Sequence, residues 1–148
     1  MSVSLRSYTA ADEEAAIELW RRAWQLHYPG IDFTARLPWW RARWRNELVP
    51  VATITVAEGA GGLVGFVTVD SKTRYLDQIV VAPEAWGSDV AAALIAEAKR
   101  LSPGGLDLAV NADNTRAIRF YEKQGFATTG EDFNPLSGAP VRKMSWRP

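Results

Sequence analysis

The stretch between Tyr75 and Val110 constrains the fold of this chain most, because it predicts a strand, a helix and a second strand in direct succession. A strand is expected over residues 75–81, and Pro83 cannot prolong it because proline has no N–H to donate to a neighbouring strand. Apolar residues then recur at helical spacing over residues 90–101, and a further apolar run covers residues 106–110. Two strands of one sheet that are joined through a helix lie parallel. The stretch therefore predicts a parallel pair of strands.

The N-terminal part of the chain predicts a strand and two helices. Residues 5–8 can form a short strand, and Thr9 and Asp12 have the spacing of a capping box that opens a helix running to about His27. An apolar stripe at helical spacing indicates a second helix, and it consists of Leu37, Trp40, Trp44 and Leu48. The neighbouring arginines are expected to face water.

A hairpin, a short helix and two more strands complete the series. The β-branched runs at residues 51–57 and 64–69 flank a glycine-rich turn and predict the hairpin. A helix is expected over residues 114–123, followed by strands at residues 126–129 and 141–146. The order is therefore β-α-α-β-β-β-α-β-α-β-β. This order predicts an α/β fold of the mixed α+β type, with one mixed sheet and helices on its faces.

The composition bounds both the architecture and the chemistry. A chain of 148 residues suits one domain over residues 1–148, and no linker or repeat interrupts it. Lys plus Arg and Asp plus Glu both number 17, so no overall positive field favours a nucleic acid or an anionic membrane as partner. No run approaches the roughly 20 apolar residues of a spanning helix and the first residues lack an apolar leader, so we expect a cytoplasmic protein. The lack of cysteine and the single histidine, His27, exclude a thiolate nucleophile and a multi-histidine metal site, and no metal is implied.

Two motifs lie in the C-terminal half of the chain. The first is the strand Asp77–Pro83 followed by the loop and helix start Glu84–Ala91. The second runs from Asn111 to Phe126 and joins a strand end, an Asn, a Tyr at fixed spacing and a helix-ending glycine. Together they resemble the GNAT superfamily, whose members transfer an acyl group from acyl-CoA to an amine. The resemblance implies acetyl-CoA as co-substrate and two central parallel strands that splay apart around the thioester.

The resemblance also implies cofactor-side roles for residues of both motifs. Backbone N–H groups of the fourth strand would meet the thioester carbonyl, which places Ile79, Val80 and Val81 along the acetyl and pantetheine groups. Asn114 and Tyr121 are seven residues apart, about 20° from eclipsed on a helix, so they share one face. In the family the Asn contacts the pantetheine end and the Tyr donates a proton to the thiolate. Tyr121 as a core aromatic residue and Asn114 as a helix cap fit the residue pattern too.

The acceptor amine arrives mostly charged, so a base or a water chain must remove its proton. The position on the strand makes Asp77, or water held by Gln78, the candidate for this role. A carboxylate that is only solvated or salt-bridged fits the same pattern, because a single Asp on a strand is common. Both interpretations of Asp77 stay open at the level of the sequence.

The loop that would hold the pyrophosphate departs from the family pattern Gln/Arg-x-x-Gly-x-Gly/Ala. Its positions are here occupied by Trp86, Gly87, Ser88, Asp89, Val90 and Ala91. The final small residue is kept, whereas Trp86 replaces a polar side chain and Asp89 replaces glycine. We expect Asp89 to stabilise the free helix, by opposing its dipole and capping an N–H group. The same carboxylate would repel a pyrophosphate by about 1 kcal/mol at about 4 Å in a water-like dielectric, so we expect reduced cofactor affinity.

The acceptor is not specified by these motifs. In the family the first two helices shape the acceptor pocket, which makes Tyr28 and Trp39 candidate substrate contacts. Cations and tryptophans within residues 36–45 could stack on bases, but the helical period and the neutral net charge argue against a nucleic-acid partner.

The resemblance predicts acetyl transfer from acetyl-CoA to a primary amine of a small molecule, a peptide or a protein, by direct attack. The alternative is a GNAT-fold ligand-binding or interaction module with weakened catalysis, which the altered loop favours. The C-terminal strands of such folds often pair between subunits, which leaves a homodimer open.

Overall fold

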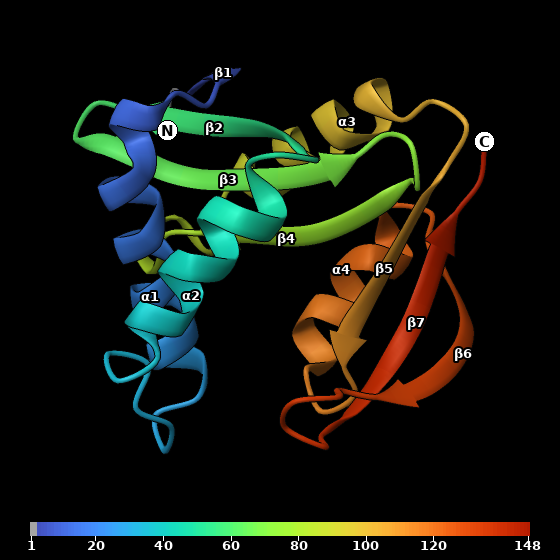
Figure 1. Ribbon diagram of the computed structural model, residues 1–148. Helices are drawn as coiled ribbons and strands as arrows, with labels where there is room; N and C mark the ends of the chain where they lie inside the picture. The colour runs from blue at the N-terminus through green and yellow to red at the C-terminus, as the bar shows by residue number, and fades with distance from the viewer. Residues whose placement is uncertain (1–2) are drawn as a thin grey trace.

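A seven-stranded mixed sheet organises the computed structural model, which describes residues 3–148 (Figure 1). The strand order is β1-β2-β3-β4-β5-β7-β6. Strands β4 and β5 are parallel, and the other neighbours are antiparallel, which confirms the predicted mixed sheet. The strands are β1 (Ser4–Ser7), β2 (Thr53–Gly59), β3 (Gly62–Asp70), β4 (Tyr75–Val81), β5 (Leu106–Asn111), β6 (Ala127–Phe133) and β7 (Pro140–Trp146).

Helices cover both faces of the sheet, with α1 and α2 on one face and α3 and α4 on the other (Figure 1). The Lys99 ammonium of α3 donates to the Gln124 carbonyl at the end of α4 at 2.5 Å, which joins the two helices of the second face. The helices are α1 (Glu13–His27), α2 (Leu37–Arg43), α3 (Val90–Leu101) and α4 (Thr115–Lys123). Shorter turns are the 3-10 turns η1 (Ala10–Asp12) and η3 (Pro83–Ala85) and the π-helical turn η2 (Trp44–Leu48), which prolongs α2.

The predicted order of elements is confirmed, and the main difference lies in β6. The sequence predicts a strand over residues 126–129, whereas β6 continues to Phe133. A bulge between Thr128 and Gly130 keeps this polar continuation paired with β7. Because β6 is an edge strand with most of its residues exposed, it lacks the apolar run by which buried strands are recognised.

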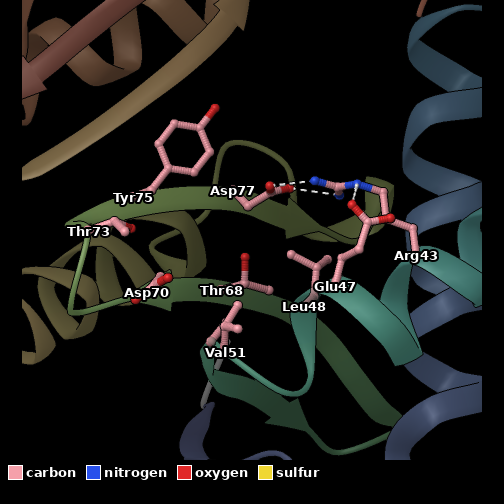
Figure 2. A pocket seen from close by; sticks show the side chains of 10 residues that line it. Arg43, Glu47, Leu48, Val51, Thr68, Asp70, Thr73, Tyr75 and Asp77 are labelled. Carbon is pink, nitrogen blue, oxygen red and sulfur yellow. Dashed lines mark hydrogen bonds and ion pairs between the residues drawn. The ribbon is translucent and has the colours of Figure 1, made fainter.

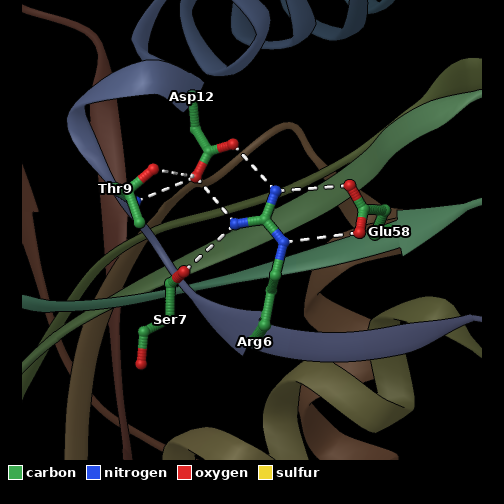
Figure 3. A network of polar contacts seen from close by, with 5 residues as sticks. All are labelled: Arg6, Ser7, Thr9, Asp12 and Glu58. Carbon is green, nitrogen blue, oxygen red and sulfur yellow. Dashed lines mark hydrogen bonds and ion pairs between the residues drawn. The ribbon is translucent and has the colours of Figure 1, made fainter.

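An ion-pair network ties the first strand to the first helix and to β2 (Figure 3). The Arg6 guanidinium donates to both carboxylate oxygens of Asp12 at 2.8 Å and to Glu58 at 3.3 and 3.4 Å. The Thr9 N–H also donates to Asp12, at 2.9 Å, which confirms the predicted capping box. The bonds from Arg6 lower the pKa of Asp12 to about 2.

An aromatic core fills the space between α1, α2 and the sheet. Trp40 stacks on Trp20 of α1 with ring centroids 4.5 Å apart, and Trp44 meets Phe66 of β3 edge-on at 5.2 Å. The burial of Trp40, Trp44 and Leu48 confirms the predicted apolar stripe. These contacts fix α2 against the sheet.

The expectation that the arginines around the stripe face water alone is wrong for three of them. Arg41 and Arg45 pair with Glu14 and Glu13 of α1, and Arg43 pairs with a carboxylate of β4. Helix periodicity shows only that these side chains leave the apolar stripe. It cannot show that α1 and β4 present carboxylates beside them.

The parallel strands β4 and β5 separate soon after they meet. Their register contains the single pair Tyr75 and Asp107, and the Asp107 N–H donates to the Arg74 carbonyl at 2.8 Å. From there the two strands diverge, with α4 behind the opening (Figure 1). The splayed arrangement implied by the resemblance is therefore present.

Two features are absent from residues 3–148. No helix in this range combines the length and the apolar character needed to cross a bilayer. No group of three or more His, Cys, Asp or Glu side chains in the same range is placed to hold a metal ion.

Candidate active site at the splayed strands

The β4 backbone presents two N–H groups to the opening. Gln78 and Ala82 point their N–H groups to β3, where they donate to the Thr68 hydroxyl at 3.0 Å and the Val64 carbonyl at 2.8 Å. Because backbone groups alternate along a strand, Ile79 and Val81 point their N–H groups away from β3. No strand pairs with β4 on that side beyond Tyr75. Among the predicted residues, Ile79 and Val81 thus turn their backbone N–H groups toward the opening, whereas Val80 is paired with Phe66 of β3.

A bulge in β4 produces this geometry. The register with β3 shifts between Thr68 and Val69, so that Asp77 is the extra residue of the strand. A bulge bends a strand and increases its local twist, which turns β4 away from β5. The candidate base therefore stands where the two strands begin to diverge.

Tyr121 lies on α4, on the opposite side of the sheet from α2. Its ring is buried against Phe120 and Phe126, with centroids 5.5 and 5.6 Å away. The hydroxyl group makes no hydrogen bond within residues 3–148, although the side chain is almost fully buried. Burial of the phenol raises the pKa of Tyr121 well above its usual value. The proton therefore stays on the oxygen throughout the neutral range.

The sequence leaves two interpretations of Asn114, and the structure bears out the cap. The Asn114 side-chain oxygen accepts from the Ala117 N–H at 3.2 Å and begins α4. This bond leaves the amide NH₂ group of Asn114 free to donate. The helix ends where predicted, because Gly125 takes φ of 92°, a backbone conformation that favours glycine.

Asp77 stands in a two-bond ion pair with α2 (Figure 2). The Arg43 guanidinium donates to the two Asp77 oxygens at 2.9 and 2.6 Å. The bond to Asp77 raises the pKa of Arg43, whose guanidinium also lies 5.5 Å from the centre of the Trp40 ring. The Gln78 side-chain amide donates to Asp77 at 3.1 Å, which brings the two candidate base residues together. Asp77 is therefore both salt-bridged and placed at the opening.

A pocket of about 230 Å³ lies beside this ion pair, over β3 and β4 (Figure 2). Its walls come from β3, β4 and the η2 turn. They include three carboxylates, one guanidinium and a half-exposed phenol, which belong to Glu47, Asp70, Asp77, Arg43 and Tyr75. The pocket is therefore negative on balance, on the face of the sheet that carries α1 and α2.

The two residues predicted to contact the acceptor substrate, Tyr28 and Trp39, lie in different surroundings. The Tyr28 hydroxyl at the end of α1 accepts from the Asn111 amide at 2.9 Å and donates to Asp113 at 2.9 Å. These bonds join α1 to the turn after β5. Trp39 instead lies 44% exposed on α2, where Trp40 is its aromatic neighbour, and neither residue lines the pocket beside Asp77.

The loop before α3 differs from expectation in its capping. Asp89 is the N-cap residue of α3, but its side chain makes no capping bond and is exposed. The predicted cap is therefore wrong, and the Ser88 hydroxyl stands nearest the Val90 N–H, at 3.4 Å. Asp89 has a backbone φ of −82° and ψ of 0°, not the extended conformation from which an N-cap side chain usually reaches its own helix. Its charge is free toward solvent.

Trp86 turns its indole back onto β4. The indole N–H donates to the Val81 carbonyl at 2.9 Å, and the Arg116 guanidinium of α4 lies 5.2 Å from the centre of the ring. The next residue, Gly87, takes φ of 81°, which brings the chain round into α3. The loop thus connects the end of β4 to both helices of the second face.

A comparison with protein families decides the identity of this arrangement. The model described as the acetyltransferase (GNAT) family matches residues 7–126, which is most of the chain. The chain belongs to this family.

Relatives of this GNAT chain agree in sequence and in fold. Peptidyl-lysine N-acetyltransferase YjaB of Salmonella typhimurium is 29% identical over 134 residues, 88% of this chain and 87% of that protein. The solution structure of apo YjaB from Escherichia coli has a TM-score of 0.80 at 24% identity, covering 99% and 98% of the two chains. The PaiA N-acetyltransferase of Thermoplasma acidophilum in complex with coenzyme A has a TM-score of 0.79 at 21% identity over both full chains. The GNAT chain is accordingly an acyltransferase of the N-acetyltransferase type.

Arg43 and Arg116 are the site residues that sequence reasoning missed. Arg43 appears in the sequence as one of several arginines on a helix, and its partner Asp77 is 34 residues away. Arg116 appears as an exposed position of α4, and its neighbour Trp86 belongs to the loop before α3. Neither contact has a spacing signal, because each joins separate elements of this GNAT fold.

Proposed function

We propose that this chain transfers the acetyl group of acetyl-CoA to the side-chain amine of a lysine in a peptide or protein, by direct attack on the thioester. The observation that carries the proposal is the divergence of β4 and β5, which leaves the N–H groups of Ile79 and Val81 without a strand partner. An unpaired strand edge inside an opening is suited to an extended ligand with amide and carbonyl groups.

Acetyl-CoA fits the residues around this opening. Its thioester carbonyl and pantetheine amides are the kind of groups that pair with the free edge of β4. The NH₂ group of Asn114 remains free for the pantetheine end, because the side-chain oxygen is used as a cap. Residues 86–91 turn into the start of a 12-residue helix, whose N–H groups and dipole favour phosphate. The co-substrate named in the proposal would lie along these three sites.

Acyl transfer requires stabilisation of the carbonyl oxygen and proton transfers at both the nitrogen and the sulfur. When the amine nitrogen bonds to the carbonyl carbon, negative charge develops on the oxygen, and the Ile79 and Val81 N–H groups can stabilise it. The ammonium form of the acceptor must first lose a proton, to Asp77 or to water beside Gln78. The C–S bond then breaks, and the Tyr121 hydroxyl donates its proton to the departing sulfur. The attached nitrogen loses its remaining extra proton to solvent, and solvent returns a proton to the phenol. The products are an N-acetylated amine and a free thiol.

The two proton carriers occupy opposite faces of the sheet, which supports direct attack. Asp77 lies on the side of α2, where an acceptor would enter past the negative pocket. Tyr121 lies on the side of α3 and α4. Each carrier can therefore serve its own substrate without contact between them.

The proposed acceptor rests on the relative and on charge. The Salmonella relative is named for peptidyl-lysine. The pocket beside Asp77 has more carboxylates than cations, and a lysine ammonium is attracted to such a surface. An acceptor with a carboxylate next to its amine would meet repulsion there.

One contact favours a second function, a GNAT-fold binding module with little turnover. The Trp86 indole occupies the Val81 carbonyl at 2.9 Å, a group that a pantetheine amide would otherwise use. Asp89 adds an unpaired negative charge to the loop for the phosphates. A chain that binds the coenzyme weakly and transfers no acetyl group would match this second function.

The deciding experiment offers acetyl-CoA and two matched peptides with blocked N-termini, one with a lysine and one with arginine in its place. Mass spectrometry should detect an added acetyl group on the lysine peptide alone. Acetylation of small diamines but of neither peptide would overturn the lysine assignment. Weak coenzyme binding with no transfer to any amine would favour the binding module.

A further inference from the structure

The Arg116 side chain lies against the loop that opens α3, although it belongs to α4. Its guanidinium carbon is 5.2 Å from the centre of the Trp86 ring, within the range of a cation–π contact. Arg116 takes part in none of the ion pairs found among residues 3–148. Its charge is therefore directed at this loop without a carboxylate to neutralise it.

Trp86 is held in a fixed orientation beneath that charge. Its indole N–H donates to the Val81 carbonyl at 2.9 Å, so the ring is attached to the last residue of β4. The side chain is half-buried and packs against the core, with one face toward Arg116. A ring anchored in this way limits where the guanidinium can lie.

The loop itself contains no cation. Residues 86–91 include one charged side chain, the exposed Asp89, and the preceding Glu84 is already paired with Arg22 of α1 at 2.5 Å. A diphosphate group approaching the start of α3 would meet a net negative loop if Arg116 were absent. The position at which the family pattern has Gln or Arg is occupied here by Trp86, which carries no charge.

We propose that Arg116 binds the diphosphate of coenzyme A and that Trp86 is the residue that positions it. The positive charge that the loop lacks is thus supplied by α4. The proposal rests on the proposed function, because it requires that the coenzyme binds along β4. It also gives the substitution of Trp86 a role, since the indole face holds the guanidinium where the loop needs positive charge.

The test is calorimetric titration of the full chain with coenzyme A and with 3′-dephospho-coenzyme A. Arg116→Ala should weaken both ligands about tenfold, which is the lower end of what bonds to a charged group contribute. Arg119→Ala is the matched control, because it removes the same charge from an exposed position of the same helix. Its affinities should stay within about twofold of the unchanged protein, because an exposed charge outside the site is screened by salt.

A second pair of variants tests the positioning role. Trp86→Ala should weaken coenzyme A binding in the unchanged protein but have almost no further effect in the Arg116→Ala background, because both changes remove one interaction. Trp86→Phe retains a ring and should retain most of the affinity. Arg116→Lys should recover part of the loss, since a point charge replaces the planar guanidinium.

The outcomes separate this inference from the proposed function. If the unchanged protein fails to bind coenzyme A, the proposed function falls and this inference with it. If it binds and Arg116→Ala binds equally well, only the role of Arg116 is overturned. A loss confined to coenzyme A, with 3′-dephospho-coenzyme A unaffected, would put Arg116 at the 3′-phosphate and overturn the assignment to the diphosphate.

Discussion

The two faces of β4 are stabilised by different interactions. The face toward α1 and α2 carries the Arg43–Asp77 ion pair and a pocket with further carboxylates. The face toward α3 and α4 is largely apolar, and Tyr121 keeps its hydroxyl group there without a partner. An ion pair requires an ionised Asp77, whereas burial keeps Tyr121 protonated. In the proposed mechanism, this difference separates the proton acceptor Asp77 from the proton donor Tyr121 without direct contact between them.

Removal of the phenol on the apolar face should have the largest effect on catalysis. Tyr121→Phe is expected to lower kcat by about 100-fold, within the range of a lost general acid. Coenzyme A affinity should change by less than about twofold, because the ring and its packing remain. Steady-state kinetics together with calorimetry would measure the two effects separately. An unchanged kcat would defeat the acid role of Tyr121.

The rate at alkaline pH gives a second test of Tyr121 as the proton donor. Burial raises the pKa of Tyr121, so the phenol keeps its proton up to a higher pH than a free tyrosine. The rate of the unchanged protein should therefore show no loss from phenol ionisation below about pH 10. A fall at lower pH that disappears in Tyr121→Phe would contradict the burial argument.

A change on the charged face should have a smaller effect that depends on pH. Asp77→Asn is expected to lower kcat/KM about tenfold at neutral pH, because water beside Gln78 can still accept the proton. Raising the pH should reduce the defect, since more of the acceptor amine is then neutral. Asp70→Asn is the control, because Asp70 lines the same pocket outside the ion pair. Equal defects at neutral and alkaline pH would indicate that Asp77 acts only by holding Arg43.

A substitution in the loop before α3 tests whether the charge of Asp89 weakens the binding of coenzyme A. Asp89→Gly should bind coenzyme A about fivefold more tightly, the equivalent of about 1 kcal/mol of removed repulsion. The loss of the charge should not unfold α3, because the Asp89 side chain caps no N–H group. Calorimetry decides the sign, and equal or weaker affinity would count against the repulsion.

The smallest expected effect concerns the contribution of the Arg6–Asp12 ion pair to the free energy of unfolding at low pH. Arg6 lowers the pKa of Asp12 to about 2, below its value in the unfolded chain. A depressed pKa gives stability that is present above about pH 4 and is lost as the pH falls toward about 2. Asp12→Asn should therefore cost about 0.5–1 kcal/mol at neutral pH and almost nothing at about pH 2.

Hydrogen exchange at decreasing pH would compare the two faces within one sample. Amides of α1 should lose protection before those of α3, because Arg41 of α2 and Arg45 of η2 also pair with carboxylates of α1. Simultaneous loss in both helices would show that the ion pairs do not distinguish the faces.

The order of elements was predictable because each has a local signal. Apolar periodicity identifies α1 and α3, and the glycine and Asn114 mark the ends of α4. The exposed end of β6 was not predictable from an apolar run, because an edge strand in contact with water needs none.

Only those features of the candidate site that lie within one strand or one helix could be predicted from the sequence. The alternation of β4 and the helix face of Asn114 and Tyr121 follow from local geometry. The ion pair of Asp77 with Arg43 and the contact of Trp86 with Arg116 depend on how helices dock on the sheet. Local periodicity contains no information on such docking, so these partners appear only in the folded chain.

The most direct test of the account measures amide hydrogen exchange in β4 by nuclear magnetic resonance, with and without acetyl-CoA. Without ligand, Ile79 and Val81 should exchange quickly, whereas Val80 between them should be protected by its pairing with β3. Acetyl-CoA should slow the exchange of Ile79 and Val81 and leave Val80 unchanged. Protection of all three amides before the ligand is added, or no response of Ile79 and Val81 to saturating acetyl-CoA, would contradict the claim that the open edge of β4 holds the thioester.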